Sequence, residues 1–140
     1  MAVTIFAAID VGSYEVSMDI YQISPKIGIE KIDEVRSRIE LGHDTYTNGK
    51  ISYESAQRLG EVLGDFSRIM KEYKVTSYRA CATSTLQEAR NVWIVLEQVY
   101  QRTGIRVEIL SNSEQRFLDI NRLQLRKQIF QKLFRKGLQL

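Results

Sequence analysis

The chain has 140 residues but a single cysteine, a single histidine and a single proline. One cysteine, Cys81, excludes an internal disulfide and a zinc site built from several cysteines. One histidine, His43, argues against a histidine metal cluster and against a Ser-His-Asp triad. No run of about 18 apolar residues is present to span a membrane, and the N-terminus lacks the basic start of a secretory signal. We therefore expect a protein of the cytoplasm.

The composition is that of a folded protein, with 44% hydrophobic and 26% charged residues. A chain of this length forms one domain or a piece of one. Its net charge of +3 is unevenly distributed, because residues 121–140 hold six basic side chains and no acidic one. That leaves 14 of the 20 basic residues against all 17 acidic ones, a charge of −3 for residues 1–120. The basic character lies in the tail.

A short, mostly apolar run predicts a buried strand over Val3 to Ile9. Alternating apolar and polar residues predict two more strands, over Val16 to Ile23 and Ile27 to Ile39. A tight turn at Asp10 to Ser13 would open this antiparallel meander. After Ser52, a good N-cap, apolar residues recur at steps of three and four up to Tyr73. This spacing predicts an amphipathic helix.

Two further strands, Tyr78 to Ala82 and Arg106 to Leu110, alternate with helices. Ser84 followed by Gln87 is a capping-box pattern, which predicts a helix from Ser84 to about Arg102, closed by Gly104. Residues 111–113 open a last helix. The alternation of strands and helices predicts an α/β fold, with a mixed sheet built from the meander and parallel strands.

A polar loop follows the first strand, where Asp10, Gly12 and Ser13 stand at the turn. Glycine lets the backbone approach an anion, loop amides can line a phosphate, and a nearby carboxylate can hold the hard cation that phosphates need. Short turns between strands use the same residue types, so a plain hairpin turn remains an alternative.

Similar polar loops follow the next two strands. Thr83 and Ser84 stand between a strand and a helix start, where an anion is favoured, although Ser84 could simply cap the helix. Residues 111–114 repeat the arrangement. Three strand ends that each feed a polar loop indicate a shared crevice at one edge of the sheet.

Three blocks of the sequence carry a resemblance to a known family. They are Phe6 to Ser13 (FAAIDVGS), Ala82 to Asn91 (ATSTLQEARN) and Thr103 to Ser111 (TGIRVEILS). In this order and spacing they resemble the N-terminal part of the exopolyphosphatase and guanosine pentaphosphate phosphatase (Ppx/GppA) family, over residues 3–119. The resemblance implies an actin-like ATPase fold, in which two ribonuclease-H-like lobes face a phosphate-binding cleft.

The family resemblance also implies an activity and a set of site residues. Family members hydrolyse terminal phosphates of polyphosphate or guanosine penta/tetraphosphate with Mg²⁺. By position, Asp10 matches the acid associated with the cation, and Gly12 and Ser13 match the first phosphate loop. Thr83 and Ser84 match a second polar loop that also binds phosphate. No nucleic-acid partner is expected, and the sequence leaves a homodimer open.

The chain departs from the family pattern at three places. Tyr14 and Glu15 replace the usual Asn-Ser, so Glu15 adds negative charge beside a phosphate loop. Gln87 stands where a phosphate-binding arginine is common, which removes a bidentate cation. The general-base position falls on Gln115, and an amide cannot take a proton from water at neutral pH. A shift of the alignment by one residue makes Glu114 the base, and Glu114 is our candidate.

Past Asp119 the resemblance stops. Residues 120–140 form either a basic amphipathic helix, suited to a membrane or an acidic partner, or an out-of-frame reading of a longer family member. Residues 119–124 can be encoded so that a shift of one base spells the family-like continuation Y-K-S-I-A. Our hypothesis is one lost base, and it fails if the DNA beyond Leu140 encodes no G-G-G-S phosphate loop in a neighbouring frame.

Three functions follow from these patterns. The first is a truncated phosphohydrolase domain with Asp10 holding Mg²⁺ and Glu114 activating water. The second is an inactive remnant or a phosphate-binding module that lacks the second lobe and its phosphate loop. The third is an adaptor with a basic tail, in which deletion of residues 121–140 would abolish a salt-dependent interaction.

Overall fold

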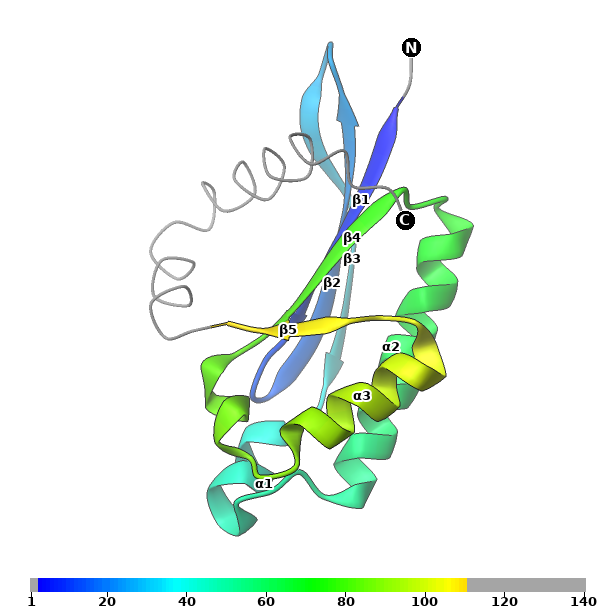
Figure 1. Ribbon diagram of the computed structural model, residues 1–140. Coiled ribbons are helices and arrows are strands. Elements are labelled where there is room, and N and C mark those ends of the chain that lie inside the picture. The colour runs from blue at the N-terminus through cyan, green and yellow to red at the C-terminus, as the bar shows by residue number, and fades with distance from the viewer. Residues whose placement is uncertain (1–2, 111–140) are drawn as a thin grey trace.

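The computed structural model describes residues 3–110, which form one mixed five-stranded sheet with helices packed against it (Figure 1). The strand order is β3-β2-β1-β4-β5. The predicted α/β architecture is therefore confirmed for this part of the chain. The last predicted helix and the basic tail lie outside the described residues.

The predicted meander is present as β1 (Thr4–Val11), β2 (Glu15–Ser24) and β3 (Gly28–Arg38), which pair antiparallel. Burial alternates along β2, as expected of a strand with one face in the core. Gly28 adopts a φ of +81° at the β2–β3 turn, a conformation that glycine reaches without steric strain. The sequence thus identified all three strands, β1 by its apolar run and β2 and β3 by their period-two alternation.

Two shorter strands, β4 (Ser77–Ala82) and β5 (Val107–Ile109), extend the sheet beyond β1. β4 pairs parallel with β1, and β5 pairs parallel with β4. Parallel strands bring their carboxyl ends to the same edge of a sheet. The polar loops that follow β1 and β4 therefore start at one edge, as the sequence predicted.

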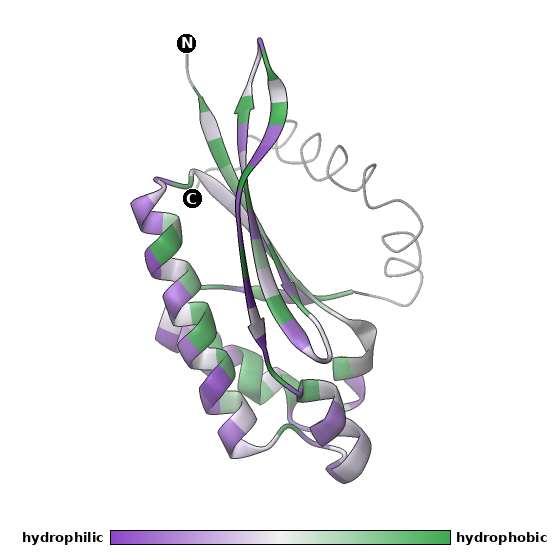
Figure 2. Cartoon of the chain, turned by 180° about the vertical axis from the view of Figure 1, so that it is seen from behind, coloured by the Kyte–Doolittle hydropathy of each residue, from purple (hydrophilic) through white to green (hydrophobic). Residues whose placement is uncertain are grey.

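The long helix α2 (Tyr53–Glu72) begins as predicted, because the Ser52 hydroxyl accepts a hydrogen bond from the Ser55 amide. Its apolar side packs on the sheet together with α3 (Val92–Thr103), and Figure 2 shows hydrophobic and hydrophilic residues alternating along both helices and strands. Gly104 ends α3 in the left-handed conformation. A second, smaller apolar cluster of Phe6, Tyr21 and Ile23 lies on the opposite face of the sheet.

The predicted single helix from Ser84 to Arg102 is wrong. The segment is a short 3₁₀ helix, η1 (Ser84–Glu88), followed by a break and then by α3. Ala89 is extended, with a ψ of 128°, and both Ala89 and Leu86 are buried. The break turns both side chains into the core. The burial of this apolar surface stabilises the fold, and a local capping pattern carries no information about it. Thr83 takes the N-cap position without a side-chain hydrogen bond, so the predicted capping box does not open a long helix.

A further helix, α1 (Leu41–Asn48), was not predicted from the sequence. Only Leu41, Gly42 and Thr45 of this helix are buried, so its sequence carries too little amphipathic pattern to be recognised. Gly49 ends α1 with a φ of +68°. None of the helices in the described part is long and apolar enough to cross a membrane.

Candidate functional site

The carboxyl ends of β1 and β4 are joined by a hydrogen bond at the edge where the polar loops begin. The Thr83 amide donates to the Val11 carbonyl over 3.1 Å, and the Leu110 amide donates to the Ala82 carbonyl over 3.1 Å. These bonds continue the parallel pairing beyond the strands. The first two predicted loops therefore lie side by side, whereas the third, with Glu114, lies outside the described residues.

The first loop is a tight turn that requires glycine. The Gly12 amide donates to the Glu15 carbonyl over 2.8 Å, and a Cβ added at Gly12 would lie 2.8 Å from that same oxygen. The chain beyond the turn is fixed by two more bonds, from the Gly42 amide to the Ser13 carbonyl and from the Ile39 amide to the Tyr14 carbonyl. Part of the Asp-Gly-Ser signal is thus explained by the turn itself.

Asp10 is exposed and stands one residue before the end of β1. Ile9 and Val11 on either side of it belong to the core, so its carboxylate points to the opposite face of the sheet. Within residues 3–110, no three His, Cys, Asp or Glu side chains form a site that could hold a metal by protein groups alone. Mg²⁺ commonly binds through one or two carboxylates, waters and substrate phosphates, and a single aspartate at a phosphate loop fits that mode.

The second loop holds an unsatisfied buried hydroxyl. In the described part of the chain, the Thr83 Oγ1 atom is buried and makes no hydrogen bond. Buried hydroxyl groups are nearly always hydrogen-bonded, so this atom has a free donor and free lone pairs for a ligand. Ser84 is the first residue of η1, a helix of only five residues, so the predicted dipole of a long helix does not act here.

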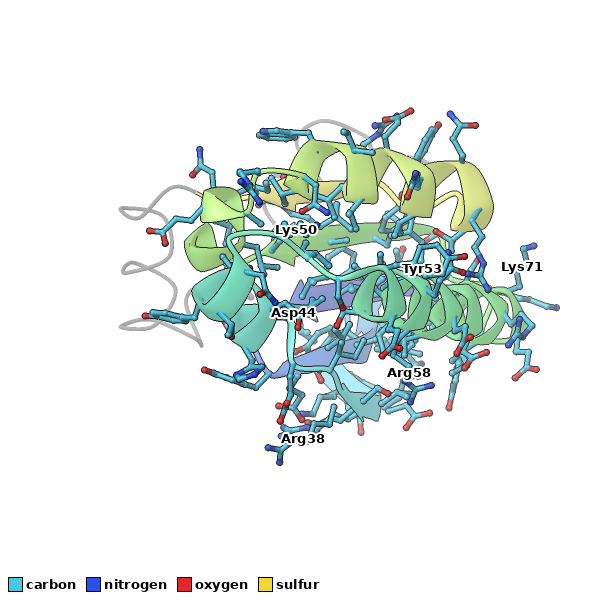
Figure 3. The ribbon with its side chains drawn as sticks, turned by 90° about the horizontal axis from the view of Figure 1, so that it is seen from below. Arg38, Asp44, Lys50, Tyr53, Arg58 and Lys71 are labelled. Atoms are coloured by element: carbon cyan, nitrogen blue, oxygen red, sulfur yellow. The ribbon has the colours of Figure 1, made fainter. Side chains whose placement is uncertain are left out.

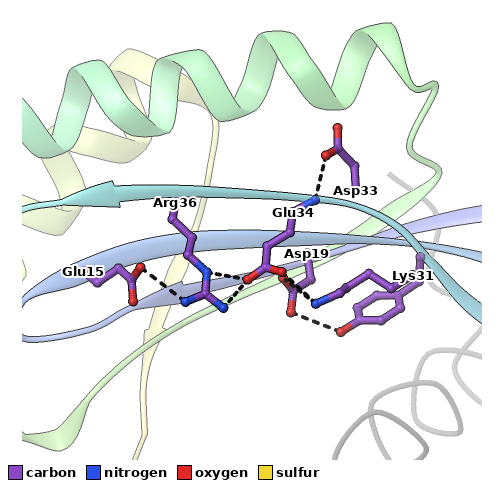
Figure 4. Close-up of polar contacts among 7 residues, drawn as sticks. Glu15, Asp19, Lys31, Asp33, Glu34 and Arg36 are labelled. Atoms are coloured by element: carbon purple, nitrogen blue, oxygen red, sulfur yellow. Dashed lines mark hydrogen bonds and ion pairs between the residues drawn. The ribbon is translucent and has the colours of Figure 1, made fainter.

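Glu15, which adds negative charge beside the first loop, is paired. Arg36 on β3 places its guanidinium 3.7 Å from the Glu15 carboxylate and also bonds Glu34 (Figure 4). Hydrogen bonds from Lys31 and then Arg36 lower the pKa of Glu34, and the bond to Glu34 raises the pKa of Arg36. A ladder of charges on β2 and β3 therefore offsets the unfavourable charge of Glu15. Sequence reasoning missed Arg36, although cross-strand alternation could have placed it.

Gln87, which replaces a cationic residue of the family pattern, is exposed on η1. The nearby Arg90 lies on the far side of the break at Ala89, and its guanidinium donates to the Asn48 carbonyl over 3.5 Å. Within residues 3–110, the hydrogen bond from the Thr83 amide to the Val11 carbonyl places the second loop beside the one at Gly12 and Ser13, and Gln87 contributes no cation there.

The start of α2 is anchored by Asp44 of α1, another residue that sequence reasoning missed. Its carboxylate accepts hydrogen bonds from the hydroxyl and the amide of Ser52, over 2.8 and 3.2 Å. In Figure 3, Asp44 lies between α1 and the start of α2, far from Lys71 at the other end of that helix. Burial opposes ionisation of Asp44, but hydrogen bonds from Ser55 and Ser52 outweigh it and lower its pKa.

Comparison with known proteins agrees with this arrangement. The model of the Ppx/GppA phosphatase family matches residues 20–117. The chain is 26% identical over 110 residues to a guanosine-5'-triphosphate,3'-diphosphate pyrophosphatase of Aliivibrio fischeri, covering 79% of this chain and 22% of that protein. It is 29% identical over 79 residues to exopolyphosphatase 1 of Mycobacterium leprae, covering 56% of this chain and 23% of that protein. The chain thus spans about a fifth of the length of these relatives.

The fold is also similar to that of a crystallised Ppx/GppA family member from Aquifex aeolicus. The TM-score is 0.76 and the sequence identity 28%, with 79% of this chain and 36% of that chain covered. This similarity confirms the predicted ribonuclease-H-like lobe of the actin-like ATPase fold. With its fold, its paired loops and the match over most of its length, the chain belongs to the Ppx/GppA phosphatase family.

Proposed function

We propose that the chain supplies one wall of a phosphate cleft in a phosphohydrolase that removes the terminal phosphate from polyphosphate or from guanosine penta/tetraphosphate. The observation that carries this proposal is that two polar loops lie side by side at one edge of the sheet, and that the buried Thr83 hydroxyl in the second loop has no hydrogen-bond partner among the protein groups. A ligand oxygen would satisfy that hydroxyl, which explains why it is kept in a buried place.

Each loop has a distinct part in this proposal. The backbone at Gly12 and Ser13 would lie against one phosphate, and the tight turn, which leaves no room for a Cβ at position 12, would hold it there. Thr83 and Ser84 donate hydrogen bonds to the next phosphate. Two loops in fixed positions orient a phosphate chain, and orientation is a large part of catalysis in phosphoryl transfer.

Asp10 would hold Mg²⁺ at the edge of the cleft, where the cation would neutralise charge on the phosphate oxygens. Glu114 would orient a water molecule and take its proton as that water attacks the terminal phosphorus. The relatives named above include both a guanosine polyphosphate enzyme and an exopolyphosphatase. The proposal therefore includes both substrate classes, guanosine polyphosphates and inorganic polyphosphate.

A second candidate is a phosphate-binding module without turnover. Two departures from the family pattern favour it, because Gln87 contributes no cation and Glu15 needs Arg36 to offset its charge. Such a module would bind a phosphate chain through Gly12 and Thr83 but leave it intact.

Phosphate release by the purified 140-residue chain separates the two candidates. With Mg²⁺ and tripolyphosphate or guanosine pentaphosphate, the first predicts phosphate release that Glu114→Gln and Asp10→Asn abolish. Glu61→Gln, a change of an exposed carboxylate on α2, is the matched control and should leave release unchanged. Binding without release supports the module, and neither binding nor release contradicts both candidates.

A further inference from the structure

Helix α1 contacts the elements that carry both phosphate loops. At its start, the Gly42 amide donates to the Ser13 carbonyl over 2.7 Å. Just past its end, the Gly49 carbonyl accepts a hydrogen bond from the Arg90 amide over 2.9 Å. Eight helical residues span about 12 Å, so α1 bridges the first loop and the segment that follows the second. Figure 1 shows α1 and the η1 segment side by side at the same end of the molecule.

Asn91 makes a connection through two hydrogen bonds to Ile51, which lies just beyond α1 in the link to α2. Its side-chain amide donates to the Ile51 carbonyl over 2.8 Å, and its side-chain oxygen accepts from the Ile51 amide over 2.9 Å. The two residues are 40 positions apart in the sequence. Asn91 is half-buried and Ile51 is 2% exposed, so water competes poorly for these bonds. The side chain of Asn91 thus pairs with both the N–H and the C=O of Ile51, as the backbone of a residue on an antiparallel strand would.

A short, well-packed segment connects Asn91 to the second loop. Successive backbone bonds run from Val92 to Ala89, from Ala89 to Leu86 and from Leu86 to Thr83, over 3.1 to 3.2 Å. Leu86 and Ala89 are 1% and 3% exposed, which fixes this segment against the core. A displacement at Asn91 would therefore be passed to Thr83 rather than absorbed by a loose loop.

We propose that Asn91 is a positioning residue that sets the separation of the two phosphate loops by holding the η1 segment to Ile51, in the link that follows α1. This inference rests on the proposed function, because the separation matters only if one ligand spans both loops. Without the Asn91 pair, the loops keep their sequences but sample several separations. A ligand must then select one of them, and its affinity falls by the fraction of time that the correct one is present.

The other end of α1 gives an independent way to disturb the same separation. A Cβ added at Gly42 would lie 2.7 Å from the Ser13 Cβ, closer than real side chains approach each other. Gly42→Ala therefore forces the first loop away from α1 without touching Asn91. If α1 connects the two loops, changes at either end of it disturb the same loop separation. Their effects on binding affinity are then not additive.

Binding of tripolyphosphate with Mg²⁺ to the full 140-residue chain, measured by calorimetry, tests the inference. We expect Asn91→Ala and Gly42→Ala each to weaken binding about five- to tenfold, and the double variant to be weaker by less than the product. Asn91→Asp keeps the acceptor for the Ile51 amide and should fall between wild type and Asn91→Ala. Should Asn91→Ala fail to fold, Asn91→Asp and Gly42→Ala carry the test.

The matched control is Tyr73→Phe. It removes a 2.5 Å hydrogen bond from the Tyr73 hydroxyl to Asp33, which joins the end of α2 to β3 away from both loops. This variant should lose stability but keep its affinity for tripolyphosphate. Equal loss of affinity in Tyr73→Phe and Asn91→Ala would overturn the inference, because it would mean that any destabilisation weakens binding.

Amide hydrogen exchange separates failure of this inference from failure of the proposed function. If the wild-type chain does not bind tripolyphosphate, the proposed function fails. Asn91→Ala should still accelerate exchange at the Gly42 and Thr83 amides, which bond the two loops, whereas Tyr73→Phe should not. Unchanged exchange at both amides in Asn91→Ala would refute the positioning role of Asn91 whatever the ligand does.

Discussion

The guanidinium of Arg36 lies 3.7 Å from the carboxylate of Glu15, at the start of the strand that follows the proposed phosphate loop. Both side chains are well exposed, so the pair contributes little to the stability of the fold. The Arg36–Glu15 pair matters instead because it lies beside the loop at Gly12. If the loop at Gly12 binds phosphate as proposed, the cation of Arg36 partly cancels the negative charge that Glu15 places beside it.

Neutralising the charges of this pair should change phosphate binding more than it changes the stability of the fold. We expect Arg36→Gln to weaken tripolyphosphate binding about two- to fivefold at low salt, because Glu15 is then uncompensated. Glu15→Gln should restore the affinity in the Arg36→Gln background. Titrations at low and high ionic strength check this, since added salt should shrink the difference. A loss that persists unchanged in the double variant would show that Arg36 contacts the ligand directly.

Removal of the Thr83 hydroxyl should stabilise the fold and impair the site. Thr83→Val replaces a buried, unbonded hydroxyl by a methyl group, and we expect a gain of about 1 kcal/mol in the free energy of unfolding. The same change removes a donor to the phosphate and should reduce binding or phosphate release. Urea denaturation and a phosphate-binding assay on the same preparation measure both effects. A destabilised Thr83→Val would mean that the hydroxyl already has a partner.

Two glycine-to-alanine changes should have opposite signs. At Gly12 the new Cβ would meet the Glu15 carbonyl at 2.8 Å, and we expect a loss of about 1–3 kcal/mol in stability together with loss of phosphate binding. At Gly64, inside α2, the nearest atom is 4.0 Å away, and alanine should stabilise the helix by about 0.5–1 kcal/mol. Thermal unfolding of both variants and of the wild type measures these changes in stability. Equal stability of the two would contradict the geometry of the first loop.

Asp44 should make the stability of the chain depend on pH in the acid range. Its pKa is lowered from the usual 3.8 in the folded state, so its contribution is fully present above the pKa of the unfolded chain. The contribution is lost as the pH falls through the lower, folded-state pKa, because the protonated acid no longer accepts both bonds from Ser52. Asp44→Asn should lower stability at pH 7 and reduce the difference in stability between pH 7 and pH 3. Urea denaturation at the two pH values measures this, and an unchanged difference would exclude Asp44 as its source.

Local patterns sufficed for most of the sheet and for the longest helix. The alternation in residues 16–23 and the stripe after Ser52 are repeated over many residues, and each repeat agrees with burial of one face. The break at Ala89 could not be predicted in this way, since Ser84 and Gln87 satisfy a local capping rule. Burial of Leu86 and Ala89 against other elements overrides that rule. Helix α1 escaped prediction for the opposite reason, because its own pattern is weak and its place depends on contacts with Ser13 and Arg90.

The sequence by itself determined the family, the meander, the long helix and the residue types of the two polar loops. These are properties of short segments, whose hydrophobic period, capping and turn chemistry act between residues a few positions apart. The tertiary structure alone decided that Arg36 offsets Glu15, that Thr83 is buried without a partner, and that Asn91 pairs with Ile51 across 40 positions. Such relationships arise when distant segments pack together, and packing responds to the whole core rather than to any local pattern.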